Sequence, residues 1–325
     1  MSVLHPARLL ISGLLIVALG NGVSARADNA PAYRALQHGQ VDEASSLLRL
    51  QLAQNPSDAG AHQLLCRAAY AEEMADTAVD ECQKAVAAAP TSGENQMWLG
   101  RALGLKAAHA NKLSAFGLAR QAHNAFERAV QLSPENARAA SDLGEYYIAA
   151  PGIVGGGSDK AHRLAQSISS RFPAQSHRLL ALLAEKQGDL AGAEREFKAA
   201  VAAGESAEAY IDLGFFYQRH QRPDEAATTI SKALAADRTR GEVLVDAASI
   251  LTDANRLPDV AEKALREYLD SGTQTDAAPV FKVHVQLGKL LAARGDRTGA
   301  KQQYQAALAL AANYGPARKA LSSLG

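Results

Sequence analysis

Aromatic residues are scarce in this sequence: they make up 5% of the 325 positions, and tryptophan occurs once. Because large rings fill much of an ordinary core, a chain with few of them and much alanine favours thin layers of closely packed helices. Positive charge shows no excess either, since 34 Lys and Arg residues face 34 Asp and Glu residues. This balance argues against a nucleic-acid-binding protein, which needs clustered positive charge, and no polybasic tail predicts membrane binding.

Long apolar runs are absent after the N-terminus, where Leu9–Leu19 forms a run of about eleven residues. A bilayer span needs about twenty residues, so this run is too short. Residues 25–27 (Ala-Arg-Ala) and 23–25 (Val-Ser-Ala) both have the form of a signal-peptidase site. We therefore expect residues 1–27 to be a cleaved secretory signal and the mature chain to be periplasmic or secreted. An uncleaved N-terminal anchor is the alternative.

The sequence does contain an internal repeat, and its most regular unit is Ala207–Arg240. An alanine opens the second helix of each expected unit, at Ala44, Ala78, Ala122, Ala161, Ala193, Ala226, Ala261 and Ala300. Four positions later stands a core residue: Leu48, Cys82, Phe126, Ala165, Phe197, Ile230, Leu265 and Tyr304. Residues four and seven apart lie on one face of a helix. The pattern therefore predicts antiparallel helix pairs that touch through small side chains.

On the first helices leucine precedes a small residue, as in Leu213-Gly214 and Leu287-Gly288. This pattern resembles the tetratricopeptide repeat family over about residues 30–314. The resemblance implies an all-α, right-handed α-solenoid of about eight antiparallel helix pairs, occupying residues 28–325 after the signal. We expect Tyr314–Leu324 to form a C-terminal capping helix, because the last unit of an open array has no neighbour.

Two units are stretched, near residues 105–120 and 150–158. The first stretch has a helical composition and predicts longer helices or an added turn. The second is rich in glycine, but Ser158 stands where a phosphate-binding loop needs lysine. We expect a tight excursion with positive φ, capped by Ser158 or Asp159, or else a contact loop for a partner. Stretched units with this glycine-rich loop resemble those of exported bacterial repeat proteins.

Cys66 and Cys82 lie eight residues on either side of the expected turn of the second unit, near Met74. Such positions face each other across an antiparallel helix pair. An even cysteine count in an exported protein favours a disulfide. The alternative is two buried free thiols that act as small apolar side chains.

The nine histidines show no metal-binding spacing, and we interpret them as scattered surface residues. No G-x-S-x-G motif is present, and no nucleophile stands beside a base in the sequence. We therefore predict no catalytic residues, no metal and no cofactor.

The first helices of stacked pairs line the concave side of a solenoid. The register predicts a partner-binding surface there, made of Gln63, Arg67, Tyr70, Met97, Arg101, Glu145, Arg178, Phe215 and Arg219. Arginine and aromatic residues are enriched at binding hot spots, and they suit an acidic or C-terminal peptide. An ordinary solvated helix face is the alternative.

Together these features predict an exported scaffold that binds a protein or peptide through its concave face and stretched repeats, with no nucleic acid and no stable membrane insertion. The first alternative is an accessory subunit of a cell-envelope machine for secretion, cell-wall work or uptake; the second is an enzyme, which is the least favoured. A continuous groove with Arg67, Arg101 and Phe215 would favour peptide capture. An apolar patch on residues 105–120 would favour subunit docking.

Overall fold

The computed structural model describes residues 29–237, 239 and 241–324. The expected secretory signal therefore lies outside the described residues. Within them, all regular structure is helical, with 17 α-helices, one short 3₁₀ helix and no strand. This confirms the predicted all-α solenoid. No helix of the described ranges combines the length and the apolar character that a membrane crossing requires.

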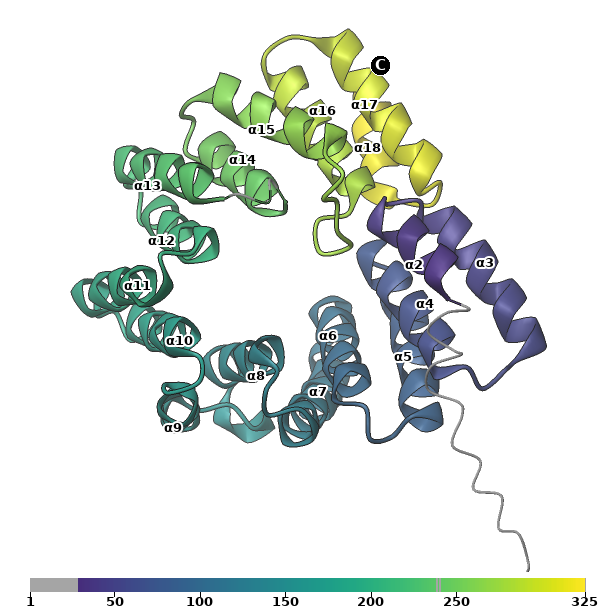
Figure 1. Ribbon diagram of the computed structural model, residues 1–325, viewed down its shortest axis with the longest axis horizontal. Helices are drawn as coiled ribbons and strands as arrows, with labels where there is room; N and C mark the ends of the chain where they lie inside the picture. Colours follow the sequence, from purple (N-terminus) through teal and green to yellow (C-terminus); the bar gives the residue numbers. More distant parts are fainter. Residues whose placement is uncertain (1–28, 238, 240, 325) are drawn as a thin grey trace, which may run out of the picture.

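The helices form eight consecutive antiparallel pairs and a final single helix. The pairs are α2 (Ala30–Gln37) with α3 (Val41–Gln54), α4 (Ala59–Ala71) with α5 (Ala75–Ala88), α6 (Gly93–His109) with α7 (Lys112–Leu132), α8 (Ala137–Ala149) with α9 (Ser158–Ile168), α10 (Pro173–Lys186) with α11 (Leu190–Gly204), α12 (Ala207–Arg219) with α13 (Pro223–Ala236), α14 (Val243–Asp253) with α15 (Pro258–Asp270), and α16 (Val280–Ala293) with α17 (Arg297–Leu310). The last helix is α18 (Gly315–Ser322). In Figure 1 the first helices of the pairs face the inside of a ring and the second helices form its outer layer.

Small residues hold the two helices of a pair close together. All eight aligned alanines are at most 1% exposed. The glycine of each Leu-Gly pair lies against a large side chain, and for three of them this is the core residue four positions after the aligned alanine. A Cβ atom on Gly100, Gly214 or Gly288 would lie 2.5–2.6 Å from Phe126, Ile230 or Tyr304. In these units a glycine on the first helix therefore leaves space for a large side chain of the second helix.

This packing makes a prediction for two glycines. Gly288→Ala is expected to destabilise the protein by about 1–3 kcal/mol, because the added methyl overlaps the buried Tyr304 ring. Gly104→Ala is the matched control: Gly104 is exposed in α6 and a Cβ there meets nothing within 4 Å, so this change is expected to stabilise by about 0.5–1 kcal/mol. Urea denaturation of both variants measures the difference. Equal effects would contradict the close-approach account.

The stretched third unit consists of two long helices, α6 with 17 residues and α7 with 21. In the fourth unit a 3₁₀ helix (Gly152–Val154) leads into Gly155 and Gly157, which both have positive φ. The expected side-chain cap is wrong: α9 begins at Ser158, its N-cap is Gly157, and no side chain caps it. Glycine suits this N-cap position because it readily adopts the φ of 149° found there.

Backbone hydrogen bonds close the glycine-rich loop. The N–H groups of Gly155, Gly156 and Gly157 donate to the carbonyl oxygens of Gly152, Pro151 and Tyr147, at 3.0, 3.2 and 2.9 Å. These donors are therefore not available to cradle a phosphate. The loop is closed by its own backbone, whereas Ile153 at its tip is exposed.

The two ends of the solenoid meet and close it into a ring (Figure 1). Val280, at the start of α16, packs on the turn between α2 and α3, where a Cβ atom on Gly39 would lie 2.7 Å from the Val280 Cβ. The Ala312 N–H donates to the Asp42 carboxylate at 2.9 Å. One buried apolar cluster includes residues of both the last pairs and α2–α4. The capping helix exists as α18, but the expectation of a last unit without a neighbour is wrong.

Candidate partner-binding surface inside the ring

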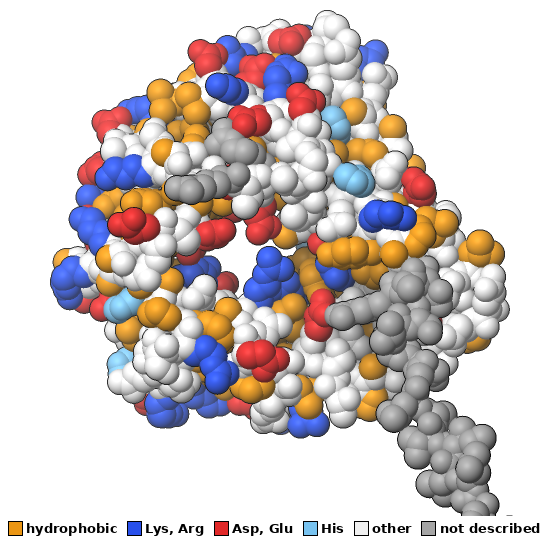
Figure 2. All heavy atoms as spheres, in the orientation of Figure 1, with side chains coloured by type: hydrophobic (Ala, Val, Ile, Leu, Met, Phe, Trp, Pro, Cys, Tyr) orange, Lys and Arg blue, Asp and Glu red, His pale blue; other side chains and the backbone are white. Residues whose placement is uncertain are grey.

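The inner face of the ring carries ion pairs that connect consecutive first helices. The Arg101 Nε on α6 donates to Asp142 on α8 at 2.6 Å. Arg178 on α10 pairs with Asp212 on α12 at 2.9 Å and with Glu145 on α8 at 2.7 Å. Figure 2 shows the centre of the ring hollowed, with acidic and basic side chains around the hollow.

These ion pairs reduce the attraction of the predicted inner arginines for an acidic partner. Arg219 is also paired, with Glu185 on α10 at 2.8 Å. A guanidinium that already has a carboxylate partner attracts an acidic peptide less strongly. The paired arginines therefore connect neighbouring repeats, and they do not favour the acidic ligand that the sequence suggested.

Other predicted surface residues lie near the junction of the two chain ends. Arg67 donates through its Nε to Asp276 at 2.7 Å. The Tyr70 ring meets the Trp98 ring edge-on, with centroids 5.7 Å apart. Gln63 is half-buried, whereas Met97 is only 4% exposed and does not contribute to the surface.

A pocket of about 320 Å³ lies farther round the ring, between α10, α12 and α14. It brings together three of the predicted residues, Arg178, Phe215 and Arg219. The remaining lining residues are apolar or acidic: Leu182, Phe197, Glu208, Ile211, Asp212, Glu242, Val243 and Asp246. Because both arginines are paired, the pocket presents a surplus of negative charge.

Asp246 is the unusual member of this pocket. Its half-buried side chain has no hydrogen bond or ion pair within the described part of the chain. Burial, together with the negative charges of Glu242 and Asp212, raises the pKa of Asp246 to about 7. Burial also raises the pKa of Asp212, although Arg178 opposes this effect. A perturbed carboxyl in a concave site is a feature of functional sites.

Asp246 was not among the predicted site residues, yet the repeat contains a signal for it. Asp142, Asp212 and Asp246 each stand two positions before the small residue of the first-helix pattern, at Gly144, Gly214 and Ala248. Asp142 pairs with Arg101, which follows Gly100 directly. At the position equivalent to Arg101 in the unit before Asp246, the sequence has Phe215. An aromatic residue therefore replaces the cation.

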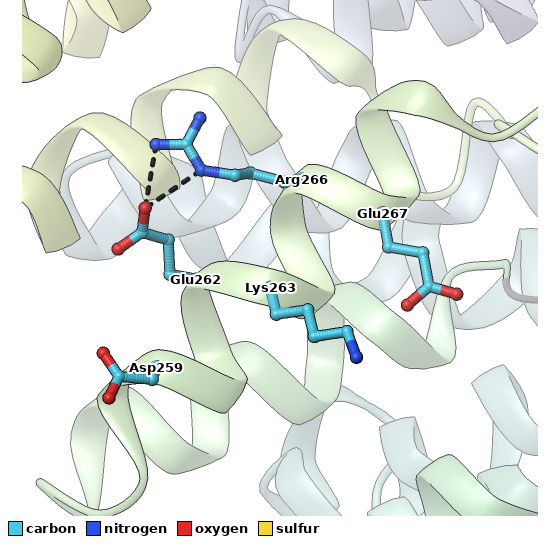
Figure 3. Close-up of a pocket in the computed structure, with 5 residues that line it drawn as sticks. All are labelled: Asp259, Glu262, Lys263, Arg266 and Glu267. Carbon is cyan, nitrogen blue, oxygen red and sulfur yellow. Dashed lines mark hydrogen bonds and ion pairs between the residues drawn. The ribbon is translucent and has the colours of Figure 1, made fainter.

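A shallow charged surface on the outside of the ring is a weaker candidate. Figure 3 shows its lining residues Asp259, Glu262, Lys263, Arg266 and Glu267, all on α15. Glu262 pairs with Arg266 along the helix at 2.8 Å. Since one helix supplies every side chain, no second wall surrounds a ligand. We interpret this surface as a solvated helix face.

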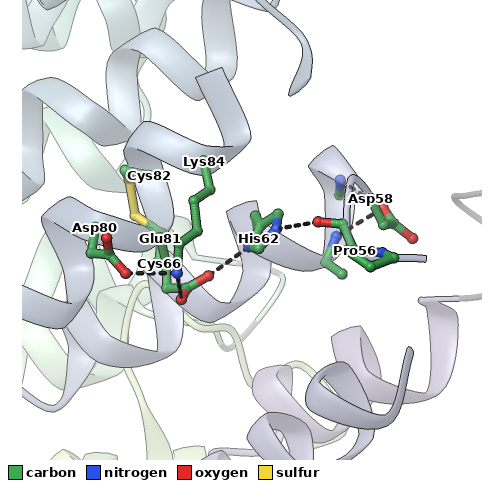
Figure 4. A network of polar contacts seen from close by, with 10 residues as sticks. Pro56, Asp58, His62, Cys66, Asp80, Glu81, Cys82 and Lys84 are labelled. Carbon is green, nitrogen blue, oxygen red and sulfur yellow. Dashed lines mark hydrogen bonds and ion pairs between the residues drawn. A yellow bond between two sulfur atoms is a disulfide. The ribbon is translucent and has the colours of Figure 1, made fainter. Parts of the chain in front are cut away.

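Three histidines are not the scattered surface residues that we expected, whereas His38, His109 and His162 are exposed. His62, His177 and His284 each stand four positions before a small first-helix residue and bond to a second-helix side chain 19 residues later. His62 is buried; its Nδ1 lies 2.6 Å from Glu81, and its Nε2 lies 3.0 Å from the Pro56 carbonyl oxygen (Figure 4). These histidines are structural links within a pair. Among the described residues, no three His, Cys, Asp or Glu side chains are arranged to hold a metal ion.

The structure joins Cys66 and Cys82 in a disulfide, with their Cα atoms 5.1 Å apart (Figure 4). Cys66 occupies the first-helix slot that holds glycine in other units, and Cys82 occupies the slot of Phe126, Ile230 and Tyr304. The bond therefore spans the closest approach of α4 and α5. In this unit it replaces the contact between a glycine and a large side chain.

The stretched repeats carry exposed apolar side chains. Leu113 and Ile153 are 87% and 75% exposed, and Phe116 is 37% exposed. The Tyr146 hydroxyl donates to the carbonyl oxygens of Ala119 on α7 and Val154, so it ties the loop of the fourth unit to the third. We call Leu113, Phe116 and Ile153 the outer patch.

Comparisons with known proteins agree with this architecture. A family model described as tetratricopeptide repeat matches residues 155–208. Yeast Tom70 is similar in fold, with a TM-score of 0.55 and 15% identity over 96% of this chain and 65% of that one. A thermophilic tetratricopeptide repeat protein from Thermus thermophilus has a TM-score of 0.47 at 21% identity, over 70% of this chain and 99% of that one. A tetratricopeptide repeat protein from Parabacteroides merdae has a TM-score of 0.46 at 14% identity, over 93% of this chain and 99% of that one. No curated protein matches. The family match covers residues 155–208, and the likeness in fold to Tom70 extends over 96% of this chain.

Proposed function

We propose that this protein is a non-catalytic scaffold that binds a segment of a partner protein inside its ring. The pocket of Asp246 and Phe215 receives a positively charged side chain, lysine or arginine, from that segment. The observation that carries this proposal is Asp246, which lacks a partner although the equivalent Asp142 and Asp212 each have an arginine. A partner cation supplies the charge that the repeat pattern omits at this position.

The surroundings of Asp246 suit a long cationic side chain. Leu182, Ile211 and Phe215 line the same pocket, and an apolar wall packs well against the methylene stem of lysine or arginine. The half-buried Phe215 ring also attracts a cation through its face. Glu208 and Glu242 add negative charge at the pocket. This chemistry reverses the expectation of an acidic peptide.

Binding of a cation is expected to depend on pH. Since the pKa of Asp246 is about 7 in the free protein, a ligand that needs the ionised carboxylate must first displace a proton at lower pH. Affinity then rises from pH 5 to about pH 7 and levels off above it, because the carboxylate is already ionised there.

A peptide array of mixed sequences tests the proposal even while the partner is unidentified. We expect the peptides that bind the wild-type chain to be enriched in lysine and arginine, and Asp246→Asn to lose this enrichment. Asp253→Asn is the matched control, because Asp253 is exposed on the same helix. Enrichment in acidic peptides, or an unchanged selection by Asp246→Asn, would refute the proposal.

We also propose, from the sequence, that residues 1–27 direct export to the periplasm or beyond. Ala25-Arg26-Ala27 and the preceding apolar run support cleavage at this point. Mass spectrometry of the exported protein is expected to find an N-terminus at Asp28 or Arg26. A protein that still begins at Met1 would argue against export by this route.

A second candidate function is an accessory subunit of a cell-envelope complex, and the outer patch favours it. Exposed large apolar side chains such as these suit a protein interface. Leu113→Glu combined with Ile153→Glu is expected to abolish co-purification of such a complex, whereas Asp246→Asn preserves it. If Asp246→Asn abolished co-purification and the double glutamate variant preserved it, the partner would bind inside the ring.

A further inference from the structure

The pocket of Asp246 holds its carboxylates at two levels, one helical turn apart. On α12, Glu208 stands four residues before Asp212, and both line the pocket. Glu242, directly before α14, stands four residues before Asp246, whose N–H donates to the Glu242 carbonyl oxygen at 3.1 Å. Residues four apart lie on one face of a helix and about 6 Å apart along its axis. We call Asp212 and Asp246 the inner level and Glu208 and Glu242 the outer level.

The outer level has no close cation within the described part of the chain. At the inner level, by contrast, Arg178 pairs with Asp212 at 2.9 Å. Glu208 is exposed, and none of the described residues forms a hydrogen bond or ion pair with its side chain. The Arg138 guanidinium lies 3.9 Å from the Glu242 carboxylate, and these side chains are 69% and 36% exposed. A pair so long and so exposed contributes little stability.

Arg138 nevertheless indicates what the outer level attracts. Arg138, Glu208 and Glu242 occupy equivalent positions in the repeat, six residues before Gly144, Gly214 and Ala248. Arg138 belongs to the fourth pair and Glu242 to the seventh, so this contact joins units that are not neighbours along the chain. The hollow in the centre of the ring separates the two sides (Figure 2). The free protein therefore already places a guanidinium beside the outer level.

We propose that the partner segment is extended and carries two basic residues at alternate positions. One binds Asp246, and the other binds Glu208 and Glu242 and takes the place of Arg138. In a strand, side chains of alternate residues point to the same side and lie about 6.6 Å apart. This spacing matches the one-turn separation of the two levels. The inference rests on the function proposed above, which requires only the first cation.

Short labelled peptides of equal charge test the spacing. Each has two lysines in a glycine and serine background, either adjacent or separated by one or by two residues. In an extended chain only the peptide with one intervening residue presents both lysines on one side. By fluorescence anisotropy with the full chain, we expect this peptide to bind about fivefold more tightly than the other two, because it makes a second charged contact. A fourth peptide with one lysine reports on Asp246 alone.

Variants of the protein separate the two levels. Glu242→Gln is expected to remove the preference among the two-lysine peptides and to keep the binding of the one-lysine peptide, whereas Asp246→Asn weakens the binding of all four. Arg138→Gln should tighten binding of the favoured peptide by about twofold to fivefold, because a competing cation is lost. Arg128→Gln is the matched control, since it removes the same charge from an exposed position on α7, and it should behave as wild type.

The outcomes distinguish this inference from the proposed function. If the three two-lysine peptides bound equally and still depended on Asp246, the second cation would be refuted and the proposed function would stand. Binding that does not depend on Asp246 would refute both. If Arg138→Gln bound the favoured peptide no more tightly than Arg128→Gln, the replacement of Arg138 by the partner would be refuted.

Discussion

Replacing Asp246 with asparagine is expected to raise the free energy of unfolding by about 2–4 kcal/mol at pH 8 and to leave it unchanged at pH 4. The pKa of Asp246 is about 7 in the folded protein, against about 3.9 in the unfolded chain. A difference of about three pH units corresponds to about 4 kcal/mol. Because the side chain retains contact with solvent, the expected effect extends down to about 2 kcal/mol.

The sign follows from the number of protons that each state binds. Below about pH 3.9 both states hold the proton, so the carboxyl does not oppose folding. As pH rises from about 3.9 to 7, the unfolded state loses its proton first, and the folded protein loses stability until Asp246 is ionised. Asparagine avoids this loss because it never ionises. Urea denaturation at pH 4, 6 and 8 measures the trend, with Asp253→Asn as the control.

A variant that gains stability at high pH would identify Asp246 as a residue kept at a cost to folding. A binding residue that has no partner in the free protein is expected to lower its folding stability in this way. Equal or lower stability of Asp246→Asn at pH 8 would contradict the unpaired, desolvated state of the carboxyl.

Removing the disulfide is expected to have an effect of similar size. Cys66→Ala combined with Cys82→Ala should lower the free energy of unfolding by about 3 kcal/mol, because the bond closes a loop over a sequence separation of 16 residues. A reducing agent should destabilise the wild type by a similar amount and leave the double variant unchanged. Thermal unfolding with and without reductant provides the measurement.

The repeat suggests a sharper version of this experiment. Cys66→Gly combined with Cys82→Ile recreates the contact that Gly214 makes with Ile230 in the sixth pair. We expect this variant to be more stable than the double alanine variant, because the isoleucine fills the space between α4 and α5. If the two double variants were equally stable, the two cysteines would not occupy the packing slots that we assign to them.

The sequence predicted the helix pairs well because their contacts are local. The small residues at Gly214 and Ala226 must meet large neighbours within one unit, so their spacing appears directly in the chain. Ring closure could not be predicted in the same way. It depends on the sum of the small rotations between eight pairs, and it joins Gly39 to Val280, which lie far apart in the sequence.

The residues that line the pocket were predicted in part, whereas their role in binding stays a prediction. Arg178, Phe215 and Arg219 do line one pocket, because the register identified the inner face of the first helices. The register alone did not show that the two arginines are paired, since Asp212 comes from the unit after Arg178 and Glu185 from the unit before Arg219. Asp246 was missed because it differs from Asp142 and Asp212 only in lacking an arginine partner. This difference is visible in the sequence only when neighbouring units are aligned and Phe215 is found at the position of Arg101.

The most direct test of the account is the pKa of Asp246, measured by following its side-chain carboxyl signal by nuclear magnetic resonance across pH 3–9. The account predicts a midpoint near 7 that falls when a lysine-rich peptide is added, because a bound cation stabilises the carboxylate. A midpoint near the ordinary value of about 4, unmoved by the peptide, would show that the pocket neither isolates this carboxyl nor receives a cation.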